Sequence, residues 1–144
     1  MTPLKLIALD ADDLEIVSAH VQDAVIKAGE IQYIPKRESL ILPMNRFAWE
    51  EAKGVLRQHN ERRNSVLHID RVTSVQSSGI PRGKSAEVLS LLAVTFAASE
   101  LPAGVIELVF AGGGAIRAHV ECIEARLTDF GGAWEASSRP VHKV

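Results

Sequence analysis

Hydrophobic and polar positions alternate along much of the chain, and the alternation is clearest between residues 103 and 131. Ile106, Leu108 and Phe110 fall on one side of a period-2 pattern, which predicts a half-buried strand. Three consecutive glycines follow, Gly112 to Gly114. What comes after these glycines decides between two different local structures.

Residues 115 to 120 fit both a strand and a helix. Ile116, Ala118 and Val120 alternate with polar residues, which predicts a return strand and a glycine-rich hairpin turn. Yet Ile116, Val120, Ile123 and Leu127 are also spaced as one helical face. The hairpin interpretation places a short helix at residues 121 to 129, and the alternative is strand, glycine loop, helix.

The remaining pattern is mostly that of short strands. Residues 4 to 9 predict a first strand, and a helix from 11 to 27 follows it, with Asp10 as N-cap. Next come a hairpin around a turn at 35 to 38 and a third strand beginning near Asn45. Further strands are expected over residues 66 to 77, with a bend after Ile69, and over 87 to 96, where both faces are apolar.

This order of elements predicts an α+β fold. Most strands are joined by hairpins, and there is no repeated strand–helix–strand alternation of the kind found in doubly wound sheets. We therefore expect a mostly antiparallel sheet, curled into a partly open barrel, with one N-terminal and one C-terminal helix. By fold-level analogy this arrangement is like the pleckstrin-homology superfold.

Composition limits the functional classes. The 144 residues predict a single domain spanning 1–144, and a net charge of −2 gives no global attraction to nucleic acid, which we do not expect as a partner. A lone cysteine, Cys122, fits a reducing compartment, and neither a signal peptide nor an apolar run of membrane-spanning length is seen. A cytoplasmic protein is the expectation.

One local segment is basic enough to suggest a binding surface. Lysine, arginine and histidine recur between Lys53 and Arg63, and an arginine and aromatic residues precede them. Such a surface could hold an anionic ligand or a protein partner, with a tryptophan available for stacking. The residues predicted to bind are Arg46, Trp49, Arg57, Arg62 and Arg63.

Catalytic chemistry has weaker support in the sequence. His68 with Asp70, and His119 with Glu121, each share a strand face, which more often means an exposed polar face than a metal site or an acid–base pair. Cys122 lies near the start of the predicted last helix, where a low thiol pKa could be produced. We therefore predict no catalytic residue, no metal and no cofactor.

Several strings in the chain resemble a known family. They are Ala19–Ala24, Met44–Trp49, Phe110–Arg117, Val120–Leu127 and Ser138–Pro140. Together they are similar to a family of short alphaproteobacterial proteins classed as a domain of unknown function, family 2948. The resemblance implies a bacterial single-domain protein, and it transfers no site residue because the family carries no assigned activity.

The function predicted from the sequence is a non-catalytic binding or adaptor domain for a protein or an anionic ligand. One alternative is a small enzyme or a nucleotide-binding protein that uses the glycine loop 112–114, since a helix N-terminus after such a loop can hold phosphate. Another is a homodimer or larger assembly formed through an open sheet edge.

Overall fold

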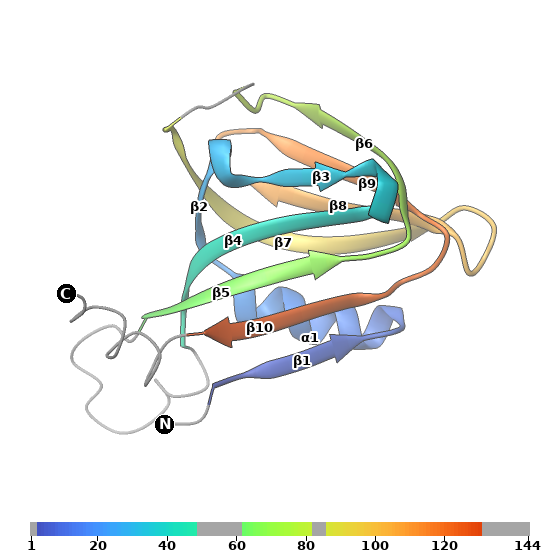
Figure 1. Ribbon diagram of the computed structural model, residues 1–144, viewed down its shortest axis with the longest axis horizontal. Helices are drawn as coiled ribbons and strands as arrows, with labels where there is room; N and C mark the ends of the chain where they lie inside the picture. The colour runs from blue at the N-terminus through green and yellow to red at the C-terminus, as the bar shows by residue number, and fades with distance from the viewer. Residues whose placement is uncertain (1–2, 49–61, 82–85, 131–144) are drawn as a thin grey trace.

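The computed structural model describes residues 3–48, 62–81 and 86–130, and these form one ten-stranded antiparallel sheet with one α-helix (Figure 1). The helix α1 spans Ala11–Val21. The strands are β1 Lys5–Ala8, β2 Val25–Lys27, β3 Gln32–Ile34, β4 Ser39–Phe47, β5 Arg62–Ile69, β6 Val72–Ser78, β7 Val88–Ala98, β8 Gly104–Phe110, β9 Ala115–Val120 and β10 Ala125–Phe130.

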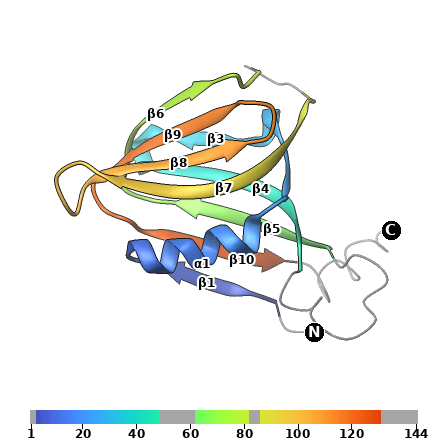
Figure 2. The same cartoon turned by 180° about the vertical axis from the view of Figure 1, so that it is seen from behind.

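The sheet folds over on itself as two halves. The strand order is β1-β10-β5-β4-β2-β7-β8-β9-β6, and β3 pairs with β4 beside this path. One half holds β1, β10, β5, β4 and β3, the other holds β7, β8, β9 and β6, and β2 links them through pairs with β4 and β7. Figures 1 and 2 show the halves facing each other, with β6 along one rim.

The chain passes between the halves twice at one place, which we call the corner and define as residues 70–71 and 121–124. Arg71, between β5 and β6, has a left-handed φ of 62°, which turns the chain sharply. The two crossings are joined, since the Asp70 N–H donates to the Glu124 carbonyl (2.8 Å) and the Glu121 N–H donates to the Arg71 carbonyl (3.0 Å). The corner therefore fixes one half against the other.

Helix α1 starts as its sequence predicts and ends earlier. The Asp10 side chain accepts a hydrogen bond from the Asp13 N–H (2.8 Å), and the Asp13 side chain accepts one from the Leu9 N–H (3.2 Å), so the two acids cap the first turn reciprocally. The helix ends at Val21 and not near residue 27, because Asp23 adopts a left-handed φ of 66° and β2 begins at Val25.

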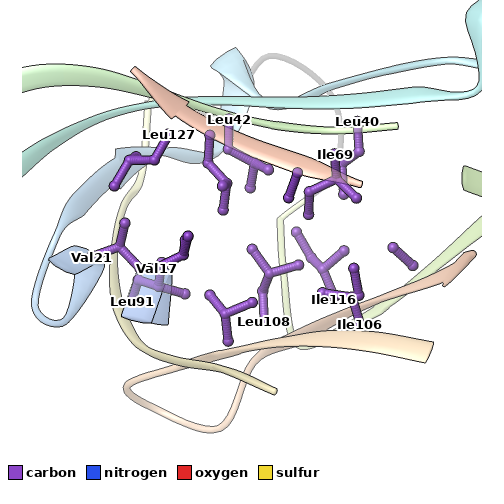
Figure 3. Close-up of a cluster of buried hydrophobic side chains, with 14 of the residues drawn as sticks. Val17, Val21, Leu40, Leu42, Ile69, Leu91, Ile106, Leu108, Ile116 and Leu127 are labelled. Atoms are coloured by element: carbon purple, nitrogen blue, oxygen red, sulfur yellow. The ribbon is translucent and has the colours of Figure 1, made fainter. Parts of the chain in front are cut away.

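One hydrophobic core fills the space between the halves. Figure 3 shows side chains from β4, β5 and β10 facing side chains from β7, β8 and β9, with α1 at one end of the cluster. Leu42 and Leu127 represent the first group, Leu91 and Leu108 the second, and all four are fully buried. Removing this apolar surface from water is the main force that holds the halves together.

Several predicted elements are confirmed by the structure. They include the first strand, the hairpin around residues 35 to 38, the bend after Ile69, the central strand over residues 87 to 96 and the hairpin over residues 104 to 120. The third strand predicted near Asn45 is the end of β4, which runs unbroken from Ser39 to Phe47.

The predicted C-terminal helix at 121–129 is wrong. Residues 125 to 130 form β10, which pairs with both β1 and β5, and this pairing overrides the helical spacing of the sequence. The sheet is curled but not closed into a barrel, since β1 and β6 are its two ends. The pleckstrin-homology analogy needed that helix and a barrel, so it is not supported. Among the described helices, none has the length and apolar character needed to cross a membrane.

Candidate functional site

The five residues predicted to form a basic binding surface are not brought together at one described surface. Trp49 and Arg57 lie outside the described residues. Arg46 is completely buried, Arg63 is partly buried and Arg62 is exposed. Arg62 lies over the Phe47 ring, 4.1 Å from its centroid, and donates to the Asn45 side-chain oxygen (3.1 Å).

Arg46 is engaged inside the protein. Its Nε and Nη2 donate to the two carboxylate oxygens of Asp129, at 2.9 and 2.8 Å, in a bidentate pair. Ser65 Oγ also donates to Asp129, and the Leu4 N–H donates to it at 3.0 Å. These contacts join β4, β5 and β10 to the segment that leads into β1.

The same contacts control the protonation of Asp129. Burial alone would raise the pKa of this carboxyl, but the hydrogen bonds from Arg46, Ser65 and the Leu4 N–H outweigh burial, and the charge of Arg46 adds to them. The pKa of Asp129 is therefore lowered from its ordinary value. The pair remains charged at neutral pH, with no ligand needed to satisfy either partner.

The glycine-rich segment is a hairpin turn between β8 and β9. Gly112 and Gly113 have φ of 90° and 98°, which only glycine adopts easily, and the Phe110 N–H donates to the Gly114 carbonyl (2.9 Å). Residues 115 to 120 are strand β9. The strand–loop–helix interpretation is therefore wrong, and these residues offer no helix N-terminus to a phosphate.

His68 and Asp70, which the sequence favours as part of an exposed polar face, contact each other in a polar cluster beside the corner. His68 Nε2 lies 3.0 Å from Asp70 Oδ1, and Arg126 Nη2 donates to His68 Nδ1 (3.1 Å). Ser39 Oγ donates to the same Asp70 oxygen (2.8 Å). Because Ser39 and His68 both bind Asp70 and not each other, the imidazole is not placed to activate the hydroxyl as a nucleophile.

The other candidate chemical groups are separate. His119 contacts Gln76 (3.2 Å), whereas Glu121 lies 3.8 Å from Arg71. Cys122 is half-buried in the corner and precedes a strand, not a helix. Within residues 3–48, 62–81 and 86–130, no three histidine, cysteine, aspartate or glutamate side chains are grouped so that they could hold a metal.

A cleft of about 720 Å³ lies between β3 and β6. Leu40 and Ile116, both buried core residues, form its floor. Ile31 and Tyr33 line it from the β3 side, and residues 75 to 77 line it from β6. A volume of this size is in the ordinary range for ligand sites, and an apolar floor with a few polar groups is typical of them.

Two hydrogen bonds lie beside the cleft, at the start of β6. The Tyr33 hydroxyl donates to the Val72 carbonyl (3.0 Å), and the Val72 N–H donates to the Glu38 carbonyl (2.8 Å). These bonds hold the start of β6 against the β3–β4 hairpin. Beyond Val72, β6 pairs only with β9, and β3 pairs only with β4, so each strand has one edge that no described strand pairs.

No charged side chain is among the described residues that line the cleft. Sequence reasoning missed this site because its walls come from segments far apart in the chain. The available signal was the composition of residues 72 to 78, which hold neither a charge nor a proline. Exposed edge strands usually carry such groups as guards against pairing.

Comparison with family models finds that one described as "Protein of unknown function (DUF2948)" matches residues 4–142. No curated protein and no solved structure matches the chain.

Proposed function

Because the chain belongs to the DUF2948 family, whose description names no activity, we propose its function from geometry: a non-catalytic binding module that holds an uncharged ligand in the cleft between β3 and β6. The observation that carries this proposal is the cleft itself, with its buried apolar floor and no charge among the described residues that line it. Burying an apolar ligand surface there would be favourable, whereas an anion would lose its hydration without gaining a cation from any described lining residue.

The described lining residues of the cleft offer no cation to an anionic ligand. Of the predicted basic residues that are described, Arg62 and Arg63 lie at the start of β5, and Arg46 is buried against Asp129. None of these three arginines is among the described residues that line the cleft. A neutral ligand in the cleft is therefore the better-supported form of the binding-domain hypothesis.

Titration with an uncharged environment-sensitive dye, Nile red, tests the cleft. Wild-type protein is expected to bind the dye saturably, with a blue-shifted emission, because the dye enters an apolar site. Val75→Lys places a charge on the cleft wall and is expected to weaken binding at least about tenfold, since burying an unpaired ammonium is costly.

Val105→Lys is the matched control. Both valines are half-buried in strands of the same half, but Val105 lines a smaller site of about 270 Å³ with Glu107 and Arg117 and does not line the cleft. Dye binding should survive this substitution. Equal loss in both variants, or no saturable binding to the wild type, would contradict the proposal.

A further inference from the structure

The backbone edge of strand β6 borders the cleft, in addition to the side chains on one of its faces. Three successive residues, Val75, Gln76 and Ser77, line the cleft. Side chains alternate between the two faces of a strand, so consecutive lining residues mean that the backbone edge itself borders the space. The free edge runs from Ser74 to Ser78, after the irregularity between Val72 and Ser74.

The opposite wall is different, because it presents side chains. Ile31 and Tyr33 are two residues apart and both line the cleft, as expected for one face of an extended segment. Ile116 and Leu40 continue this apolar surface beneath them. The cleft thus combines a row of backbone hydrogen-bonding groups on one side with apolar side chains on the other.

An extended peptide satisfies both walls at once. Its backbone can pair with the β6 edge, while every second side chain packs on Ile31, Tyr33 and the floor. A compact apolar molecule would leave the β6 backbone groups facing only water, and small-molecule sites normally enclose most of their ligand. The absence of charge in residues 72 to 78 removes the usual barrier to strand addition.

We propose that the cleft binds an uncharged, extended peptide segment of a partner protein, which adds as a strand to the free edge of β6. The proposal rests on the cleft being the ligand site, and it names the ligand class. The bound segment carries apolar residues at alternate positions. It joins β6 from the side opposite β9 and so fills the space between β6 and β3.

Selection from a displayed library of linear eight-residue peptides, with the full-length chain as target, tests this proposal. Enriched peptides are expected to have apolar residues at every second position and no charge at those positions. One enriched peptide is then synthesised in two N-methylated forms, with methyl groups on alternate residues, so that each form blocks the N–H groups of one edge only.

Strand addition predicts that the two methylated forms behave differently. Blocking the edge that pairs with β6 should weaken binding about tenfold or more, since several hydrogen bonds are lost, while blocking the other edge should leave affinity nearly unchanged. The peptide should also displace Nile red from the wild type, and Val75→Lys should bind neither, whereas Val105→Lys should bind both.

The possible failures can be told apart. Equal affinity of the two methylated forms, enriched peptides without alternation, or no enriched peptide would each overturn strand addition, even if the dye still binds the cleft. Dye binding that is unchanged in Val75→Lys would instead remove the ligand site itself. Without peptide, amide exchange over Ser74 to Ser78 could become slower as the protein concentration increases. That result would mean that a second copy of the chain occupies the edge, and it would also overturn the proposal.

Discussion

Arg46 was predicted to lie at a binding surface, but it is paired with Asp129 inside the protein. As a basic residue near other basic residues, Arg46 suggested a binding surface, yet it is fully buried. Its position in the alternating pattern indicates instead that it is buried. Leu42, Met44 and Arg46 are alternate residues of β4, and alternate residues of a strand face the same side. Ser65 and Asp129 likewise share a face with Leu67 and Leu127.

The period-2 pattern therefore places all three polar residues inside, where each needs a partner. What it could not supply is which residues meet, because β4, β5 and β10 are brought together by pairing between distant segments.

Removing the Asp129 carboxylate should destabilise the fold strongly. Asp129→Asn leaves the buried Arg46 guanidinium without its counter-charge, and breaking one partner of such a pair costs about 3 kcal/mol or more. Chemical denaturation at neutral pH measures this loss. Glu107→Gln breaks the more exposed Glu107–Arg117 pair and serves as control, with an expected change of about 1 kcal/mol or less.

The difference between Asp129→Asn and wild type should shrink in acid. The folded protein holds the pKa of Asp129 below its ordinary value of 3.8, so this carboxylate stabilises the fold fully above that value. As the pH falls below 3.8, the carboxyl becomes protonated in the unfolded chain but stays ionised in the folded protein. Its contribution to stability therefore decreases progressively, and the decrease is complete once the pH is below the lower pKa of the folded protein. An unchanged difference between pH 7 and pH 3 would contradict this assignment.

At the scale of elements, short-range patterns were reliable where turn chemistry supported them. The N-cap at Asp10 and the turn at Gly112 and Gly113 each have a local cause, and both predictions are confirmed. Residues 121 to 129 were not, because the helical spacing of Ile123 and Leu127 also fits buried positions of an extended segment. Pairing of β10 with two strands decided the outcome, and this information is not local.

The early end of α1 gives a test at this scale. Asp23 is held at φ 66°, where a side chain is strained and glycine is not. Asp23→Gly should therefore be more stable than Asp23→Ala by about 1 kcal/mol, since both lose the carboxylate but only alanine keeps the strain. Thermal and denaturant unfolding of the two variants measure the difference. Equal stability, or a more stable alanine variant, would show that this residue does not enforce the turn.

At the scale of the whole molecule, the decisive feature is that the sheet folds over without closing. A mostly antiparallel sheet could be predicted from alternation, and its strand order could not, because the crossings at the corner and the bridging by β2 depend on contacts between distant residues. The cleft arises from this arrangement. It lies where β3 and β6 are tied at Val72 but remain unpaired beyond it. Its lining residues come from two segments, 28–40 and 75–81, together with Ile116, so no single stretch of sequence could predict it.

The central claim is that this gap is closed by a strand from another protein. Residue-resolved amide hydrogen exchange of the full-length chain, with and without a selected peptide, tests it most directly. Alternate amides between Ser74 and Ser78, those not already paired with β9, should exchange more slowly when the peptide is bound, while amides of β1 at the other end of the sheet remain unchanged. Unchanged exchange along β6 at saturating peptide, or protection on β1 instead, would contradict the account.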